Sequence, residues 1–206
     1  MKNVIVIGAG GHAKVIADIV LKSGDNLKGF LDDNKDKGTT ILDEYVVLGA
    51  VENAMDFDSE DTYFIIGIGD NYTRKKLTEK FDLKYYTAIH PTAVIGADVQ
   101  IGKGSCVMPN ACINPGSVIG KGCIINSAAL IEHDNVLEDF VHVSPSATTR
   151  GDVKIGTLTH VGARATIRNR VTITSEVVIG MGATVVGDIL EKGTYIGTPA
   201  KKMEEK

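Results

Sequence analysis

The chain has 206 residues, and its 22 Lys and Arg against 26 Asp and Glu give a formal net charge of −4. The basic residues form no long runs, which argues against a nucleic-acid or membrane-surface protein, since either needs clustered positive charge. The N-terminus, MKNVIVIGAGGH, reaches glycine after one short apolar run, so we expect no signal peptide, no transmembrane span and a cytoplasmic location. Three cysteines without CxxC spacing are expected to be reduced structural thiols.

Residues 1–88 alternate short apolar runs with amphipathic segments. NVIVI at 3–7 predicts a strand followed by a glycine turn and a helix, and LKGFLDD at 27–33 predicts a second strand that ends in two acids. YFIIGIGDN at 63–71 predicts a third strand and turn, and YTRKKLTEKF at 72–81 predicts a helix. This alternation favours an α/β domain with a small Rossmann-like parallel sheet.

A period of six residues dominates the rest of the chain, residues 89–206. The aliphatic slots are Ile89, Ile95, Ile101, Val107, Ile113, Ile119, Ile125, Ile131, Leu137, Val143, Ile155, Val161, Ile167, Ile173, Ile179 and Val185, with Thr149 as the one exception. A second row four residues later is mostly small or β-branched, with Asn135 as its polar exception. Three steps of six close a triangular coil, so coils stack with a period of about 18 residues into a parallel β-helix. Glycines such as Gly96 and Gly116 suit turn positions with φ > 0.

The first candidate site is the sequence GAGGH at 8–12, which follows a predicted strand and opens a predicted helix. Backbone N–H groups at a helix N-terminus bind phosphate, and glycine lets the ligand approach closely. Residues 8–13 also fit the fingerprint G-x-G-x-x-G/A, and Asp32 and Asp33 follow about twenty residues later. Taken alone, this motif suggests NAD, but the half-sized domain favours one nucleotide. The alternative is a tight turn without a ligand.

The second candidate site is IEHD at 131–134, where a histidine stands between two acids in a predicted turn. Turn residues of a β-helix face outward, so His133 is available as a general base, a role to which imidazole is suited. Asp134 can accept from the other ring nitrogen and fix the tautomer. A histidine among acids is, out of context, more commonly a solvated surface residue.

Two further features follow from the period. His142 and His160 are eighteen residues apart and are therefore expected one coil above the other. A metal site would need a third ligand at a matching spacing, which the sequence does not offer. The sequence GTPAKK at 197–202 ends the coils with Lys201 and Lys202, which are either solvated or contact the phosphates of a ligand.

These motifs together resemble the bacterial nucleotide-sugar acetyltransferases of the PglD and NeuD type, within the hexapeptide-repeat acyltransferases. The likeness covers nearly the whole chain, through GAGGH, FLDD, GIGDN followed by RKK, IEHD, HVSPSA, GATVV and GTPAK. The resemblance implies a left-handed β-helix that trimerises, acetyl-CoA as co-substrate and no metal. It also implies that residues 1–88 bind a nucleotide sugar, with UDP as the expected nucleotide, and that residues 89–206 form the acetyl-CoA-binding catalytic domain.

The resemblance also implies roles for single residues. His133 corresponds to the catalytic base and Asp134 to the acid that raises its basicity, a position where glutamate also occurs. The implied substrate-binding residues are Gly10, Gly11, His12, Asp32, Asp33 and Gly69. The implied acetyl-CoA-binding residues are His142 beside the thioester, Gly151 as a backbone oxyanion donor, Ala163, Met181 and Lys201. Met181 stands where family members often have glycine.

We therefore expect a homotrimer that acetylates the amino group of a nucleotide-linked amino sugar for bacterial glycan biosynthesis. Three alternatives stay open. O-acetylation of a sialic-acid-like sugar would use the same constellation of residues. An oxidoreductase that uses NAD would explain GAGGHA but would leave the repeat without a role. A non-catalytic scaffold would explain the repeat but not the outward cluster of Glu132, His133 and Asp134.

Overall fold

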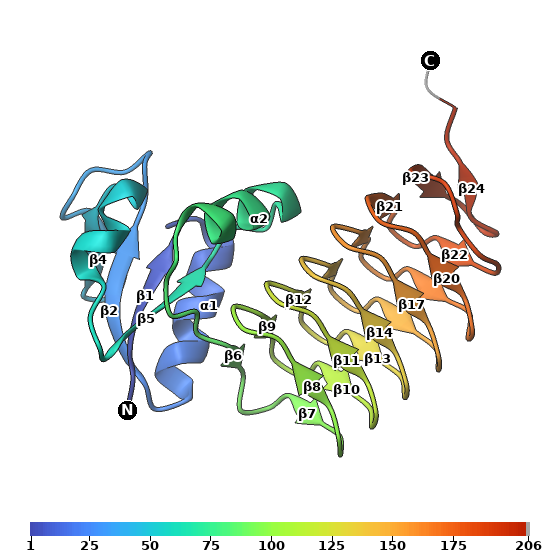
Figure 1. Cartoon of the computed structure of the whole chain (residues 1–206), viewed down its shortest axis with the longest axis horizontal. Helices are drawn as coiled ribbons and strands as arrows, with labels where there is room; N and C mark the ends of the chain where they lie inside the picture. The colour runs from blue at the N-terminus through green and yellow to red at the C-terminus, as the bar shows by residue number, and fades with distance from the viewer. Residues whose placement is uncertain (205–206) are drawn as a thin grey trace.

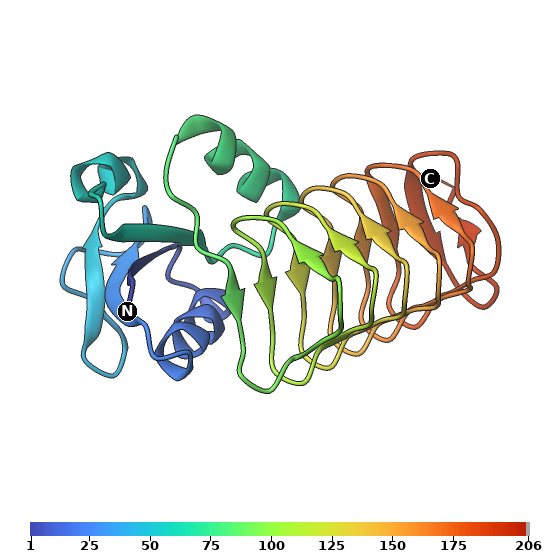
Figure 2. The same ribbon diagram turned by 60° about the horizontal axis from the view of Figure 1, so that its bottom comes forward.

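The computed structural model describes residues 1–204, so the last two residues of the expected second domain lie outside the described residues. An α/β unit is followed by a long triangular prism of stacked coils (Figures 1 and 2). The fold class predicted from the sequence, a Rossmann-like sheet followed by a left-handed parallel β-helix, is confirmed. Within residues 1–204, every helix is too short or too polar to cross a lipid bilayer.

The α/β unit is built on a five-stranded sheet in the order β3-β4-β2-β1-β5, in which only β3 and β4 are antiparallel. Its strands are β1 (Asn3–Ile7), β2 (Asn26–Leu31), β3 (Thr40–Leu42), β4 (Tyr45–Gly49) and β5 (Thr62–Ile66). The β3–β4 hairpin was not predicted, because a three-residue strand is too short to show a period. The four parallel strands correspond to one mononucleotide-binding half.

The helices of this unit are α1 (Gly11–Lys22), the 3-10 helix η1 (Val51–Phe57) and α2 (Asn71–Lys80). Alternate residues of β1 face opposite sides of the sheet, as a strand requires. Val4 and Val6 pack on the α1 side, whereas Ile5 and Ile7 pack on the side of η1. Helix α1 also packs against the first coils of the prism, since Ile16 shares a core with Cys106 and Ile124.

The prism has three faces, each named here after its first strand. The β6 face contains β6 (Ala88–Ile89), β9 (Cys106–Val107), β12 (Ile124–Ile125), β15 (His142–Val143), β18 (His160–Val161), β21 (Val177–Ile179), β23 (Gly193–Ile196) and β24 (Lys201–Lys202). The β7 face contains β7 (Val94–Ile95), β10 (Cys112–Ile113), β13 (Leu130–Ile131), β16 (Thr148–Thr149), β19 (Thr166–Ile167) and β22 (Thr184–Val185). The β8 face contains β8 (Gln100–Ile101), β11 (Val118–Ile119), β14 (Val136–Leu137), β17 (Lys154–Ile155) and β20 (Thr172–Ile173).

Residues eighteen apart are paired between neighbouring coils, as the six-residue period predicts; Ile113, for example, pairs with Ile131. The aliphatic slots from Val107 to Val185 point inward and are at most 2% exposed. Ile95 in the first coil is 37% exposed, because only the coil above covers it. The repeat therefore forms one continuous apolar core along the prism.

Polar residues in the second, small row connect consecutive coils. Ser105 Oγ donates to the Gly120 carbonyl at 2.8 Å and accepts from the Cys123 N–H at 2.9 Å. Ser117 and Thr159 make the same pair of bonds in their own coils. These hydroxyls satisfy backbone groups that the short strands leave unpaired.

The expectation that turn glycines adopt φ > 0 is confirmed at Gly116, with φ of 75°, and is wrong for Gly96. A Cβ at Gly96 would lie 2.6 Å from the Pro115 nitrogen, so glycine is needed there for the close approach of the next coil. Left-handed corner positions are mostly occupied by other residue types, including Asp134, Phe140 and Leu158.

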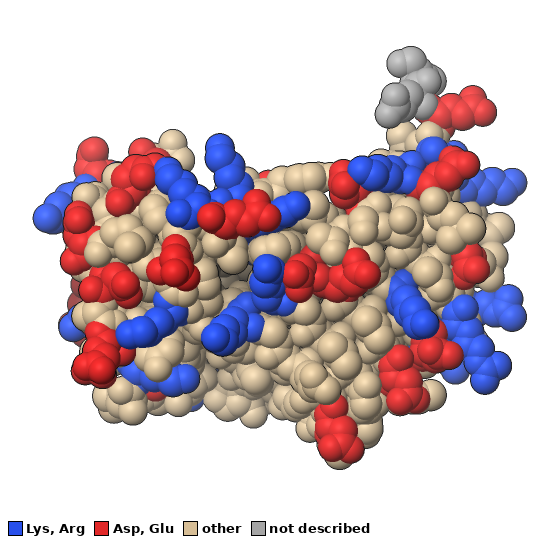
Figure 3. Space-filling view, viewed as in Figure 1, with Lys and Arg blue, Asp and Glu red and all other residues tan. Residues whose placement is uncertain are grey.

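Charged side chains of both signs are interspersed on the face shown in Figure 3, without a large region of one sign. Cys106 and Cys123 are free and buried, and burial raises the pKa of each thiol to about 12.

Thr149, the exception among the aliphatic slots, is fully buried, and its Oγ1 has no hydrogen-bond partner among residues 1–204. Thr149→Val should therefore raise the free energy of unfolding by about 1 kcal/mol, because an unpaired buried hydroxyl is destabilising. Thr159→Val is the matched control and should lower it by ~1–3 kcal/mol, since it removes two hydrogen bonds. Urea denaturation measures both; equal effects of the two substitutions would contradict the prediction.

Candidate active site

A hollow of about 350 Å³ lies at the carboxyl ends of β1, β2 and β5. Its lining residues are Gly8, Ala9, Gly10, Gly11, His12, Asp32, Asn34, Gly67, Ile68 and Gly69. No side chain caps the N-terminus of α1, so the helix presents backbone N–H groups to this hollow. The structure thus brings together the predicted residues Gly10, Gly11, His12, Asp32 and Gly69.

The two predicted acids differ in position. Asp32 lines the hollow and shapes its loop: Oδ2 accepts from the Ala9 N–H at 2.7 Å and Oδ1 from the Asn34 N–H at 2.9 Å. Asp33 is not among the lining residues; its Oδ1 accepts from the Val51 N–H at 2.8 Å. Asn34, which the sequence analysis missed, takes the place in the wall that was expected for Asp33.

Three imidazoles gather between this loop and the β6 face. The rings of His142 and His160 stack with centroids 4.7 Å apart, which confirms the predicted one-coil spacing. Burial lowers the pKa of His142 to about 3, helped by His160 and Arg74, and burial with Arg74 lowers the pKa of His12 to about 4. The same two causes lower the pKa of His160, so all three rings are held in their neutral form. In the described part of the chain, no third His, Cys, Asp or Glu joins His142 and His160 as a metal ligand.

The tautomer of His142 follows from its neighbour Asn126, which the sequence analysis did not identify. Asn126 Oδ1 accepts from the Ser127 N–H at 2.8 Å, so its Nδ2 faces His142 Nε2 at 3.1 Å and donates to it. The ring proton then lies on Nδ1, which is buried without a hydrogen-bond partner among residues 1–204. His12 Nε2 is likewise buried without a hydrogen-bond partner among residues 1–204. Buried polar atoms without partners are rare, and the backbone of Gly69 lies close enough to the His142 ring to raise its pKa against the other effects.

His133 lies at a different corner of the prism, in the turn between β13 and β14. Its Nδ1 is 2.7 Å from Asp134 Oδ2, so the shorter aspartate reaches the ring. Asp134 adopts φ of 59°, a left-handed conformation that aspartate tolerates better than most residues. The ring also lies against the coil above, because a Cβ at Gly151 would be 2.6 Å from His133 Nε2.

This corner is hollowed by about 700 Å³. The lining residues come from three stacked turns: Glu132, His133, Asp134, Arg150, Gly151, Asp152, Asn169 and Arg170. The exposed fractions of the His133 and Asp134 side chains are 61% and 66%, so the pair is open to a ligand. The predicted base, its acid and the predicted oxyanion donor Gly151 are thus brought together.

Asn135, the polar exception in the small row, holds this turn in place. The residue is fully buried, and its Nδ2 donates to the carbonyls of Glu132 at 2.6 Å, His133 at 3.2 Å and Arg150 at 3.0 Å. The sequence shows that Asn135 is polar where the row is otherwise small or apolar. It does not show that Asn135 holds the turn, because the carbonyls that it binds belong to two different coils.

The remaining predicted acetyl-CoA residues lie elsewhere on the prism. Ala163 and Met181 follow β18 and β21, at the corner between the β6 and β7 faces. Ala163 accepts from the Gly182 N–H at 2.9 Å, and Met181 is 83% exposed. Lys201 is exposed on β24 near the end of the stack. Within one chain, this corner and the His133 corner flank opposite edges of the β7 face.

Gly151→Ala should turn the His133 ring away from Asp134, because the new Cβ would overlap the ring. The free energy of unfolding should change little, since the exposed ring can rotate into solvent. Histidine NMR signals report the displacement. Gly187→Ala, in the same column two coils above, meets nothing within 4 Å and is the control. Unchanged His133 signals in Gly151→Ala would contradict the prediction.

Comparison with known proteins agrees with these features. Residues 3–81 match the model of the PglD N-terminal domain. The acetyltransferase domain of PglB from Neisseria gonorrhoeae, solved in complex with acetyl coenzyme A, is 35% identical; the match covers 98% of this chain and 99% of that domain, with a TM-score of 0.92. PerB from Caulobacter crescentus, in complex with CoA and GDP-perosamine, is 32% identical over 99% of this chain and 98% of that chain, with a TM-score of 0.89.

A curated relative is the UDP-N-acetylbacillosamine N-acetyltransferase of Bacillus subtilis, which is 35% identical over 112 residues. That match covers 52% of this chain and 52% of the relative, so the chain spans about half the length of that protein. The solved relatives, in contrast, match along almost their whole length. The chain belongs to the PglD-type family of sugar acetyltransferases, as its motifs predicted.

Proposed function

We propose that this protein transfers the acetyl group of acetyl-CoA to the amino group of a nucleotide-linked amino sugar, with His133 as the general base. The observation that carries the proposal is the His133–Asp134 pair, whose 2.7 Å contact occupies Nδ1 and leaves Nε2 toward an open hollow. PglB with acetyl coenzyme A and PerB with CoA and GDP-perosamine support the choice of substrates. Substrates of this kind also support a cytoplasmic location.

The geometry suits base-assisted acyl transfer. As the amine attacks the thioester carbonyl, a new C–N bond forms and His133 Nε2 takes the amine proton. Asp134 accepts from Nδ1–H and stabilises the imidazolium. The Gly151 N–H, beside the ring, would donate to the oxyanion of the tetrahedral intermediate. The C–S bond then breaks, and the imidazolium returns the proton to the leaving thiolate of CoA.

The nucleotide would bind in the hollow of the α/β unit. A diphosphate would lie at the N-terminus of α1, near Gly10 and Gly11, where a Cβ would meet nothing within 4 Å. The sheet has the strands for one mononucleotide half, which favours a nucleotide sugar over NAD. We expect UDP as the nucleotide. GDP is the alternative to test, because PerB was solved with GDP-perosamine.

A homotrimer would bring the separated parts together. The outward row of the β7 face has no charged residue and consists of Val94, Cys112, Leu130, Thr148, Thr166 and Thr184. A flat, uncharged face suits burial in a closed symmetric assembly. One edge of this face carries His133 and the other carries Ala163 and Met181. Packing of β7 faces would place the base of one protomer beside the coenzyme corner of its neighbour.

The activity is tested by incubating the protein with acetyl-CoA and a panel of UDP- and GDP-linked amino sugars, measuring thiol release and identifying products by mass spectrometry. Wild-type protein should N-acetylate at least one of them. His133→Ala should lower kcat by about 10²–10⁴-fold, the usual range for losing a general base. Full activity of His133→Ala would contradict the assignment of the base, and a free amino sugar acetylated equally well would contradict the role of the α/β unit.

The assembly is tested by sedimentation equilibrium at micromolar concentration, where the wild type should be a trimer. Thr148→Lys places a charge in the uncharged row and should shift the protein toward monomers with loss of acetyl transfer, because burying an unpaired ammonium is unfavourable. Thr39→Lys, at an exposed position of the α/β unit, is the matched control and should stay trimeric. A monomeric wild type with full activity would contradict the shared site.

A further inference from the structure

Arg74, on α2, is the largest of the fully buried side chains, at 2% exposure, and its role is not accounted for by the site residues above. Its guanidinium donates only to neutral oxygens of the described residues. The acceptors are the carbonyls of Gly122 at 2.9 Å, Phe140 at 3.1 Å, Gly69 at 2.8 Å and Ile68 at 3.4 Å, and Asn71 Oδ1 at 2.9 Å. Burying a cation without a carboxylate partner costs free energy of folding. The hydrogen bonds of the Arg74 guanidinium must offset that cost, so we asked what these bonds hold together.

The acceptors on the prism form a column. Gly122, Phe140 and Leu158 occupy the same corner, between the β8 and β6 faces, on three successive coils. All three have φ between 60° and 64°, and their carbonyl oxygens are available to the side chains of α2. Arg74 Nε and Nη2 bind the first two carbonyls, and Asn71 Nδ2 binds that of Leu158 at 2.8 Å. Two side chains from the first turns of α2 thus contact three stacked coils.

The other edge of the guanidinium faces the nucleotide hollow. Arg74 Nη1 donates to the carbonyls of Gly69 and Ile68, and both residues line that hollow. His142 lies two residues after Phe140, on the coil that Arg74 binds. The Gly69 backbone is near enough to the His142 ring to affect its pKa. One planar group therefore connects the wall of the nucleotide hollow with the coil that carries His142.

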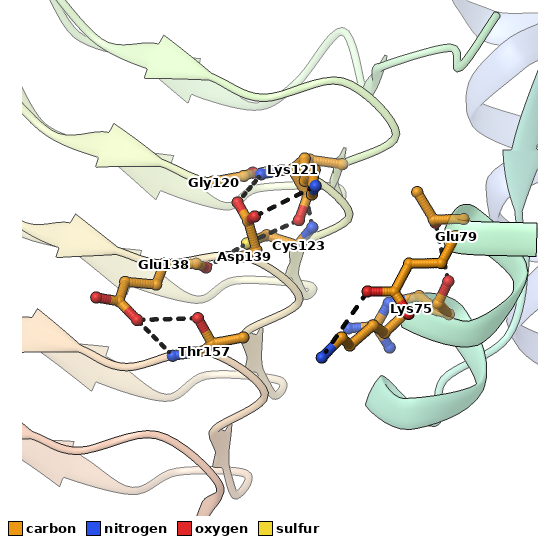
Figure 4. A network of polar contacts seen from close by, with 11 residues as sticks. Lys75, Glu79, Gly120, Lys121, Cys123, Glu138, Asp139 and Thr157 are labelled. Atoms are coloured by element: carbon orange, nitrogen blue, oxygen red, sulfur yellow. Dashed lines mark hydrogen bonds and ion pairs between the residues drawn. The ribbon is translucent and has the colours of Figure 1, made fainter. Parts of the chain in front are cut away.

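The exposed charged side chains in this region do not connect the nucleotide hollow with the coil of His142. In Figure 4, Lys75 pairs with Glu79 within α2, and Lys121 pairs with Asp139 between neighbouring coils. Tyr72 Oη does cross from α2 to Glu176, at 3.1 Å, but this contact is solvent-exposed. Among the described residues, the buried hydrogen bonds from α2 to the prism are therefore those of Arg74 and Asn71.

We propose that Arg74 is a positioning residue that fixes the nucleotide-binding loop relative to the coil of His142, so that a bound sugar is held at the acetyl-transfer centre. The proposal rests on the function proposed above. Lysine cannot replace Arg74, because a single ammonium lacks the planar fork that reaches carbonyls on both sides. Loss of the fork should leave the hollow formed but displaced, and a displacement of about 1 Å can lower a rate by ~10²-fold.

The experiment compares wild type, Arg74→Lys, Arg74→Met and Asn71→Ala, with Lys76→Met as a control that removes an exposed cation from the same helix. Calorimetric titration with UDP, or GDP if UDP does not bind, counts folded nucleotide sites. Per site, kcat should fall by about 10–100-fold in both Arg74 variants and less in Asn71→Ala, with nucleotide Kd within about threefold of wild type. Lys76→Met should behave as wild type. A merely structural role would reduce the number of sites and leave kcat per site unchanged.

A second measurement does not depend on turnover. Nucleotide binding should shift the ring NMR signals of His142 in wild type, assigned with His142→Gln, and this response should be lost in Arg74→Lys. Equal kcat per site and an equal His142 response in the Arg74 variants would overturn the proposal. If neither Arg74 variant folds, Asn71→Ala tests the proposal instead, and an unchanged kcat per site together with an unchanged His142 response in that variant would overturn it. Lack of turnover by wild type, with the His142 response still dependent on Arg74, would contradict the proposed function and not the role of Arg74.

Discussion

Each coil of the β-helix lies directly on the next, so residues eighteen positions apart in sequence are neighbours in space. This register is maintained by the inward aliphatic slots, which form one core along the prism. Several functional features of the prism consequently depend on a column of residues from stacked coils. Gly151 supports the His133 ring from the coil above, and His160 stacks on His142. The column of Gly122, Phe140 and Leu158 carbonyls accepts the hydrogen bonds by which Asn71 and Arg74 attach the α/β unit to the prism.

The fold was largely predictable because its signals are periodic. A six-residue period over a hundred residues specifies coils without any knowledge of long-range contacts. In the α/β unit, apolar runs and good helix formers predicted β1, β2, β5 and both α-helices. The β3–β4 hairpin and η1 were missed, because three to seven residues carry too little periodic signal.

The candidate site was predictable where its chemistry is local in sequence. GAGGH and IEHD are contiguous, and their residues lie together in the structure. Arg74 and Asn126 were missed for the opposite reason: their partners are 48 and 16 residues away, and nothing in RKK or IINS indicates which carbonyl or ring is contacted. Asn135 was seen as an exception to a pattern, and only the stacked coil reveals its three carbonyl acceptors.

Burial, together with the charge of Arg74, sets the electrostatics of the region between the two units. Burial and then Arg74 lower the pKa of His12 to about 4, and burial, His160 and Arg74 lower the pKa of His142 to about 3, against 6.5 in an unfolded chain. Because the unfolded state binds these protons more readily, the stability that depends on neutral rings is present above pH 6.5 and is lost as the pH falls toward 4. A neutral His142 with its proton on Nδ1 is a hydrogen-bond donor and not a counter-ion.

The two ends of the prism differ from its middle. At one end, α1 and the sheet pack on the first coils, and at the other, β24 folds back antiparallel on β23, with Tyr195 opposite Lys202. A stack of identical coils with bare ends would offer unpaired strand edges to the next molecule and grow into fibres. Here α1 packs against β6 in the first coil, while Ile95 of β7 stays 37% exposed, and at the far end the β6 face finishes in a two-residue strand of lysines, a short charged edge that a second copy pairs with poorly. The same residues that were considered for coenzyme phosphates thus also disfavour end-to-end strand pairing between the β6 faces of two molecules.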